Sequence, residues 1–183
     1  TVTLANDVEV ENMITVKNGE TLVLDLNGKT LAATDNTTKN YSAIDNRGDL
    51  TITDGSEEGT GKMTVEATVN SGWNRYSAVI ANNPGGKLTI ENGTIEHLGG
   101  TDMAYGIDNL TNGKGTYAET IINDGTVKST YRAVRQFLNG VEAQNILTVN
   151  AGTLEGANKS IFFHDPSAKA NTGTLTVAED AEL

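Results

Sequence analysis

A carboxylate and two arginines lie one repeat apart in the middle of the chain. Asp108 stands in one copy of a recurring segment, and Arg132 and Arg135 stand in the next copy. A polysaccharide lyase needs a basic Arg or Lys beside a calcium ion that carboxylates hold. A glycoside hydrolase needs two carboxylates, one that protonates the leaving oxygen and one that activates water. These three residues are therefore candidates for catalytic roles on a polysaccharide.

The recurring segment also predicts which residues stand beside Asp108. Its copies place Asp45, Ile80, Asp108 and Arg135 at equivalent positions of successive repeats. Ile80 interrupts the polar column, and no second close carboxylate is evident. The alternative to a catalytic site is a surface ion pair between Asp108 and Arg135, which contributes little to stability. We expect the ion pair and keep Asp108, Arg135 and Arg132 as the alternative catalytic set.

Aromatic and arginine residues gather in and beside the longest insertion, residues 66–75. Trp73, the only tryptophan, lies in that insertion with Arg75, and Tyr76 follows directly. Loops carry much of the function of proteins, and an aromatic ring beside polar groups suits a sugar. We expect a glycan-binding platform made of Trp73, Arg75, Tyr76 and Tyr105. The alternative is a tyrosine column that covers the edge of the core, formed by Tyr41, Tyr76 and Tyr131.

The residue types that usually bind metals are few or unsuitably spaced. The chain has no cysteine, and His97 and His164 are its only histidines, so it has no zinc motif. His164 precedes Asp165 and Pro166, which predicts a turn. Acidic residues gather at residues 49–58 without the spacing of a calcium-binding loop. We expect no cofactor and no metal site, with calcium as the one metal that remains possible.

The elements that must position these residues follow from a repeated six-residue phrase. It reads Leu88-Thr-Ile-Glu-Asn-Gly93, Thr120-Ile-Ile-Asn-Asp-Gly125 and Leu147-Thr-Val-Asn-Ala-Gly152. Earlier copies end at Gly28 and Gly55, which places one anchor glycine about every 30 residues. Such a period predicts a solenoid whose coils carry loops of varying length.

Each coil is expected to hold three short strands. Apolar residues alternate with threonine before the glycine, as in Leu88-Thr89-Ile90, and a second strand follows it, as in Gly93-Thr94-Ile95. A third strand recurs later in the repeat, at residues 41–46, 76–79, 104–109 and 131–136. The sequence therefore predicts an all-β right-handed parallel β-helix of about six coils. Residues 1–183 are expected to form a single domain.

Amide side chains recur near the end of the third strand. Stacked amides hydrogen-bond from one layer of a β-structure to the next. We therefore expect a structural amide ladder formed by Asn46, Asn82, Asn109 and Gln136.

The composition limits the possible partners. The formal net charge is −11 over 183 residues, without a basic stripe, which argues against nucleic acid as a partner. No stretch approaches 18 apolar residues, so we expect no direct membrane insertion. The oligomeric state is left open.

The amino-acid sequence of the first coil resembles that of a known group of β-helices. Residues 19–31 read Gly-Glu-Thr-Leu-Val-Leu-Asp-Leu-Asn-Gly-Lys-Thr-Leu, and coils with Gly-x-Leu-Thr-Ile and Asn-Gly-Thr-Ile follow. This wording resembles the pectate-lyase-like right-handed β-helix segments of large bacterial surface proteins, which are common in gut Firmicutes. The resemblance implies an adhesin-like protein that is secreted or attached to the cell surface. Residues 1–183 would then be one segment of a larger surface protein.

These observations favour a non-catalytic module with an adhesive or spacer role. Its expected partners are glycans or host surface proteins. The tripeptide Arg47-Gly48-Asp49, which integrins recognise, lies in a predicted turn, although one substitution creates it by chance. The alternative function is a polysaccharide lyase or glycoside hydrolase acting on a plant or host glycan, because one fold hosts many functions.

Overall fold

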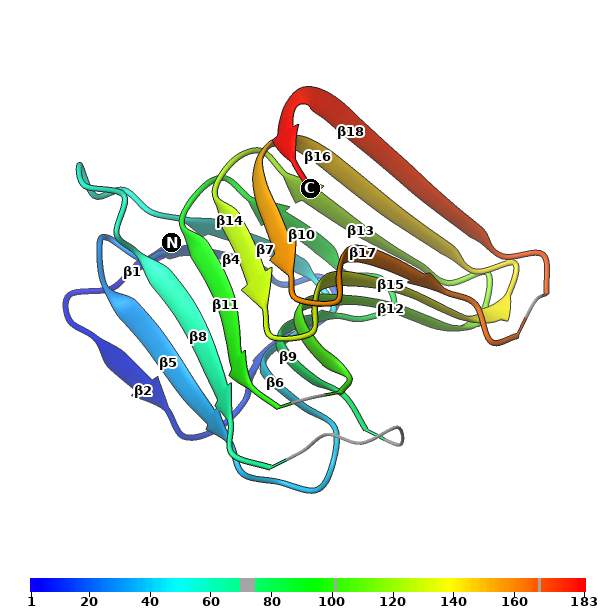
Figure 1. Cartoon of the computed structure of the whole chain (residues 1–183), viewed down its shortest axis with the longest axis horizontal. Helices are drawn as coiled ribbons and strands as arrows, with labels where there is room; N and C mark the ends of the chain where they lie inside the picture. Colours follow the sequence, from blue (N-terminus) through cyan, green and yellow to red (C-terminus); the bar gives the residue numbers. More distant parts are fainter. Residues whose placement is uncertain (70–74, 101, 168) are drawn as a thin grey trace.

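The computed structural model describes residues 1–69, 75–100, 102–167 and 169–183. Within these residues the chain is all-β, has no helix, and winds into a solenoid of about six turns (Figure 1). Every strand pair in the described part is parallel, including β10 with β13 and β12 with β15. The predicted parallel β-helix is therefore confirmed.

Each coil contributes strands at three positions. The first position holds β1 (Val2–Thr3), β4 (Thr21–Asp25), β7 (Asp49–Thr53), β10 (Lys87–Ile90), β13 (Tyr117–Ile122), β16 (Gln144–Gly156) and β18 (Thr172–Glu182). The second holds β2 (Val8–Val10), β5 (Thr30–Asp35), β8 (Lys62–Ala67), β11 (Thr94–Gly99) and β14 (Thr126–Ser129). The third holds β3 (Ile14–Val16), β6 (Tyr41–Asn46), β9 (Ser77–Asn82), β12 (Ala104–Lys114), β15 (Arg132–Val141) and β17 (Lys159–His164).

Two sheets result from this winding. The first and second positions form one twelve-stranded sheet, because β16 pairs with β13 at its start and with β14 at its end. The third position forms a separate six-stranded sheet in the order β17-β15-β12-β9-β6-β3. The outer face of this second sheet carries the candidate site.

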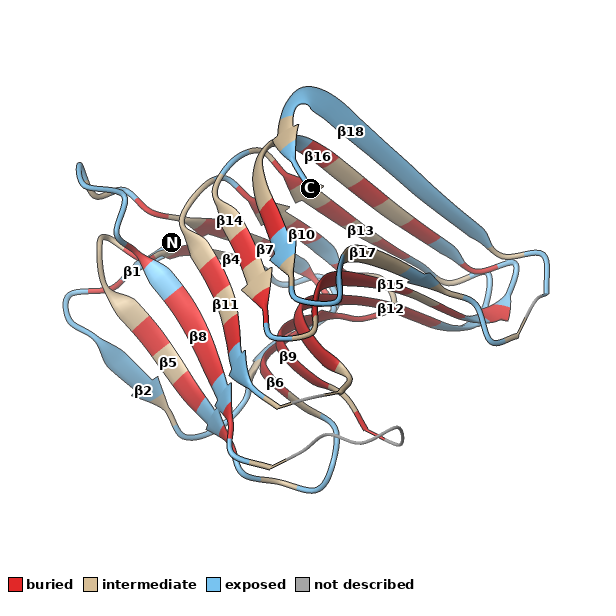
Figure 2. Cartoon of the chain, in the orientation of Figure 1, coloured by how far each residue is buried: buried red, intermediate tan, exposed pale blue. Residues whose placement is uncertain are grey.

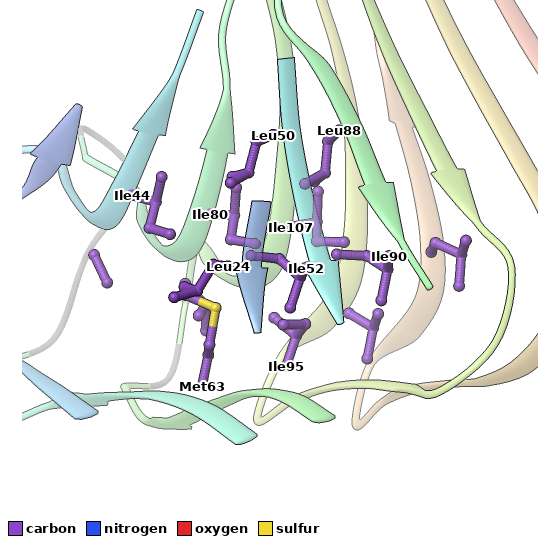
Figure 3. Close-up of a cluster of buried hydrophobic side chains, with 14 of the residues drawn as sticks. Leu24, Ile44, Leu50, Ile52, Met63, Ile80, Leu88, Ile90, Ile95 and Ile107 are labelled. Carbon is purple, nitrogen blue, oxygen red and sulfur yellow. The ribbon is translucent and has the colours of Figure 1, made fainter. Parts of the chain in front are cut away.

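The core follows from the alternation in the first strand. Leu50, Ile52, Leu88 and Ile90 point inward and are at most 1% exposed, and their side chains stack in columns (Figure 3). Thr89 lies between Leu88 and Ile90 on the outer face and is half-buried. Period-two alternation of this kind packs one face of a strand and leaves the other to solvent.

In the early coils, the anchor glycine at the corner between the first and second strands is not the one that the sequence alignment predicts. Gly93 and Gly125 have φ of 90° and 96°, and the N–H of the next coil's threonine donates to each carbonyl. The same bond reaches Gly61, whose carbonyl accepts from Thr94 at 3.0 Å, so the anchor of that coil is Gly61 and the prediction of Gly55 is wrong. The cause is a loop inserted between β7 and β8, which moves the corner along the sequence.

The third strand also has a different register from the predicted one. Asp45 pairs with Ala81, and Ala81 pairs with Asp108, so Ile80 does not belong to this column. Ile80 instead pairs with Ile44 and is fully buried in the core. A three-residue match of Tyr-Ser-Ala misaligned the segment, and burial of an isoleucine in the core decides the true register.

Tyrosines are consequently not stacked as predicted. Tyr41 pairs with Ser77, and Tyr76 stands one residue earlier, where its carbonyl accepts a hydrogen bond from the N–H of Tyr41. The predicted column of Tyr41, Tyr76 and Tyr131 is therefore wrong at Tyr76, which is displaced by one residue.

The amide ladder is confirmed. Asn46 Nδ2 donates to Asn82 Oδ1 at 2.8 Å, Asn82 Nδ2 donates to Asn109 Oδ1 at 2.8 Å, and Asn109 Nδ2 donates to Gln136 Oε1 at 3.0 Å. All four side chains are fully buried. The first three amides each donate to the next one, as buried polar groups require. The ladder ends at Gln136, whose Nε2 is buried without a hydrogen-bond partner among the described residues.

The two ends of the solenoid are less buried than its middle. Nearly all of β18 and much of β2 are exposed, whereas β9 in the middle of the solenoid is buried along its whole length (Figure 2). Leu175 and Val177 on β18 remain 40% and 39% exposed although they continue the inward columns.

Candidate ligand-binding groove

The structure brings together most of the residues that the sequence singled out. Asp108 on β12 and Arg135 on β15 are direct partners in the parallel ladder. Arg135 Nε donates to Asp108 Oδ1 at 2.8 Å, and Arg135 Nη2 donates to Asp108 Oδ2 at 2.5 Å. The two side chains are 3% and 0% exposed. The predicted ion pair exists, but its predicted position at the surface is wrong.

Aromatic rings explain why this pair is buried. The Arg135 guanidinium carbon lies 4.5 Å from the ring centroids of both Tyr105 and Phe137, and 5.7 Å from that of Tyr76. These rings cover the guanidinium from several sides and attract its charge. Burial, followed by the charges of Asp108 and Asp45, raises the pKa of Tyr76 to about 12. The Tyr76 hydroxyl therefore keeps its proton at neutral pH.

An open groove of about 400 Å³ lies over this ion pair. Its floor comes from the six-stranded sheet, and its walls come from the loops before β6, β9 and β12 and from the turn after β17. The side chains used in the argument below are Arg75, Tyr76, Leu110, Arg135, Phe137 and His164. Tyr76, Phe137 and His164 are half-buried, so each keeps part of its ring accessible.

Phe137 and His164 were not selected from the sequence. Phe137 on β15 pairs with His164 on β17, and their rings meet edge-on with centroids 5.1 Å apart. His164 ends a strand rather than beginning a turn. Burial, then the positive charges of Arg135 and Arg132, lower the pKa of His164, so its imidazole is neutral at pH 7.

A signal for Phe137 was present in the sequence. Phe137 follows the ladder amide Gln136 by one residue, as Leu110 follows Asn109, and His164 is the residue that pairs with Phe137 in the next coil. The residue after an inward amide faces outward on the same strand. Aligning the chain on its amides, rather than on its tyrosines, would have found this row.

Arg75 lies at the wall of the groove and is held by the neighbouring loop. Its guanidinium donates to both carboxylate oxygens of Asp35, at 2.9 to 3.3 Å, and to the carbonyl of Lys39 at 2.7 Å. The Asp35 and Arg75 side chains are 0% and 5% exposed. This pair fixes the loop beside the groove and leaves Arg75 little freedom to reach a ligand.

The other predicted ligand-binding residues differ in their accessibility. Tyr105 is fully buried, and its hydroxyl donates to Met103 Sδ at 3.1 Å, so it supports Arg135 from below. Trp73 lies outside the described residues. Of the predicted platform, Tyr76 is the described residue with an accessible ring.

Arg132 is the last of the predicted residues on this face. It pairs with Tyr105 on one side and with Lys159 on the other. Its guanidinium carbon lies 3.6 Å from the Phe162 ring centroid and 4.2 Å from that of Tyr131. Arg132 is 7% exposed. Among the described residues, no hydrogen bond or ion pair joins it to Asp108.

Two further findings concern metals and membranes. In the described part of the chain, no group of three or more His, Asp or Glu side chains is close enough to hold a metal ion. The same residues include no helix that could cross a membrane.

The fold and the groove define a class of protein: a parallel β-solenoid with an aromatic and arginine-lined groove on the outer face of one sheet. Comparison of the chain with protein-family models, with curated proteins and with solved structures finds no match in any of the three.

Proposed function

We propose that this chain is a non-catalytic β-solenoid module that binds glycans through the groove, in an adhesive or spacer role. The observation that carries the proposal is the set of accessible rings, Tyr76, Phe137 and His164, around the buried guanidinium of Arg135. The rest of the solenoid is the rigid support that holds these side chains on three different coils.

The chemistry of the groove suits a sugar. Aromatic faces offer apolar contact to the C–H faces of a pyranose ring, and the polar edges of tyrosine and histidine form hydrogen bonds with hydroxyl groups. Asn40 and Asn112 add exposed amides at the rim. Pockets that combine apolar walls with a few fixed polar groups are the usual sites for small ligands.

The state of Asp108 favours binding over catalysis. A general acid or nucleophile needs a free oxygen within reach of the substrate. Both oxygens of Asp108 accept hydrogen bonds from Arg135, and the carboxylate is fully buried. The ion pair therefore acts as the floor of the groove in this proposal.

The alternative is a polysaccharide lyase or glycoside hydrolase, and one observation favours it. His164 is a neutral imidazole in the groove beside Arg135, a combination that could abstract a proton next to a stabilised negative charge. Asp108 would then have only a positioning role through Arg135.

The setting we propose is a secreted or cell-surface bacterial protein, with glycans or host surface proteins as partners. Support for this setting comes from the acidic composition and from the wording of the first coil described above.

A glycan array followed by calorimetry tests the proposal. We expect saturable binding to at least one glycan, at least about tenfold weaker binding for Phe137→Ala, and no change for Thr89→Ala on the other sheet. The same glycans are then assayed for new reducing or unsaturated ends, with and without calcium. Product formation that His164→Ala abolishes would establish the enzyme instead, and an empty array would reject glycan binding.

A further inference from the structure

The arginines of the six-stranded sheet and its loops differ in their counter-ions. Arg47 pairs with Asp45 at 3.1 Å, Arg75 with Asp35 at 2.9 Å, and Arg135 with Asp108 at 2.5 Å. Arg132 forms no ion pair with any described residue, although it is only 7% exposed. Three of the four guanidinium charges on this side of the molecule are thus neutralised within the fold, and one is not.

The contacts of Arg132 hold its position but leave its charge unmatched. Its guanidinium packs between the rings of Tyr131 and Phe162, and Nη2 donates to Tyr131 Oη at 2.9 Å. Its Nε is buried and has no hydrogen-bond partner among the described residues. Rings attract a cation by about 2 kcal/mol when it is desolvated, whereas burying a charge without a counter-ion costs several kcal/mol.

The surroundings of Arg132 are positive in a protein that is negative overall. Lys159 stands beside Arg132 in the next coil and is exposed. On the other side, Asp108 is already bound by Arg135. The positive charge also affects His164. Burial lowers the pKa of His164 most, and the charges of Arg135 and Arg132 lower it further, whereas Asp108 and Asp165 raise it.

We propose that Arg132, with Lys159, is a binding site for an oxyanion: a sulfate, phosphate or carboxylate group of a ligand. An oxyanion would supply the counter-ion that the fold gives to the other three arginines. Arginine presents five N–H donors. The Nε–H of Arg132 is buried, so the anion would contact the Nη groups, of which Nη2 also donates to Tyr131 Oη. The site does not depend on glycan binding in the groove, because a free inorganic anion would also occupy it.

A titration with inorganic anions tests the site directly. Sodium sulfate, or sodium acetate in a second series, is added at constant ionic strength while the side-chain N–H resonances of arginine are recorded by NMR. We expect a saturable shift of the Arg132 Nε–H resonance with at least one of the two anions. The sulfate series represents tetrahedral anions and the acetate series carboxylates, so their comparison identifies the preferred group.

Matched variants complete the test. Arg132→Gln should weaken anion binding by at least about tenfold, measured by the remaining shifts around Lys159, and Arg132→Lys should weaken it less because the charge is kept. Arg47→Gln removes the same charge from a paired arginine of this sheet and should leave binding within about twofold. Absence of a saturable Arg132 shift in the unmodified protein would overturn the proposal. Shifts around Lys159 that persist unchanged in Arg132→Gln would overturn it as well. Neither result depends on whether a glycan binds.

Discussion

Arg135 reaches across one coil to Asp108, and its guanidinium donates hydrogen bonds to both carboxylate oxygens, at 2.8 Å and 2.5 Å. Both groups are almost completely removed from water and covered by aromatic rings. The pair therefore belongs to the packing between coils as much as to the groove above it.

Removal of either partner is expected to destabilise the fold. Asp108→Ala or Arg135→Ala leaves an uncompensated buried charge, and each should lower the free energy of unfolding by about 3–5 kcal/mol. The double variant Asp108→Leu with Arg135→Met should lose less free energy of unfolding than the two single variants lose together. Urea unfolding followed by circular dichroism measures all three. A free energy of unfolding that stays unchanged in the single variants would contradict the structural role and favour the catalytic one.

Interruption of the amide ladder is expected to cost stability at its centre. Asn82→Ala removes the acceptor of Asn46 Nδ2 and the donor to Asn109 Oδ1, so both are left in the core without that bond. Each unsatisfied buried group costs about 1–3 kcal/mol, which predicts a loss of at least about 2 kcal/mol.

The control for this prediction is an amide on the outer surface. Asn123 donates to Glu91 and accepts from Asn150 in an exposed row. Asn123→Ala should change the free energy of unfolding by no more than about 0.5 kcal/mol, because water replaces the lost partners. Equal losses at Asn82 and Asn123, in the same urea experiment, would show that burial of the ladder is not what makes it matter.

The glycine corner should tolerate no side chain where coils are in contact. A Cβ at Gly125 would collide with the carbonyl oxygen of Gly93, and φ is 96°. Gly125→Ala should therefore cost about 3 kcal/mol, from backbone strain and from overpacking together. Gly59→Ala is the matched control, because φ is 63° there but the space is open, and it should cost about 1 kcal/mol. Thermal unfolding that ranks the two variants in the opposite order would refute this account.

Stability should depend on pH through His97. The ring is 1% exposed, its Nε2 lies 2.8 Å from Ser77 Oγ, and burial, despite the opposing charge of Asp35, lowers the pKa of His97 from 6.5 to about 4. Between these two values the unfolded chain binds more protons than the folded one, so stability rises with pH. The contribution of neutral His97 to the free energy of unfolding is complete above about pH 6.5 and is lost as the pH falls to about 4.

The measurement is urea unfolding between pH 4 and pH 7.5 for the unmodified protein and for His97→Gln. His97 changes the free energy of unfolding by at most about 1.4 kcal/mol per pH unit. Carboxylates and His164 titrate in both proteins, so they cancel in the difference between the two curves. Parallel curves would mean that His97 is not buried in its neutral form.

Much of the fold was predictable because its causes are local or repeat from coil to coil. Alternation in Leu88-Thr89-Ile90 predicted an inward and an outward face, and both are observed. Asn46, Asn109 and Gln136 predicted the amide ladder, since a buried amide on one coil needs an amide on the next. These properties depend on residue type and on a spacing that the chain itself displays.

The alignment of individual coils was less predictable where loops differ in length. The insertion before Gly61 moved the corner away from Gly55, and the match at Tyr76 misplaced Ile80. A repeat in the sequence shows that coils are similar, but only stacking decides which residues are neighbours. The core column of Ile44, Ile80 and Ile107 makes that choice, because a slip of one residue would turn these side chains away from the core.

The sequence by itself determined a stack of parallel coils, its inward columns and its ladder of amides, and it selected Asp108, Arg132 and Arg135 as one group. The tertiary structure alone decided that Asp108 and Arg135 are buried, that Phe137 and His164 join Tyr76 around a groove, and that Arg132 lacks an acidic partner in the described chain. The physical reason is that burial and pairing depend on side chains from different coils, whose distances are set by packing and not by their separation in sequence.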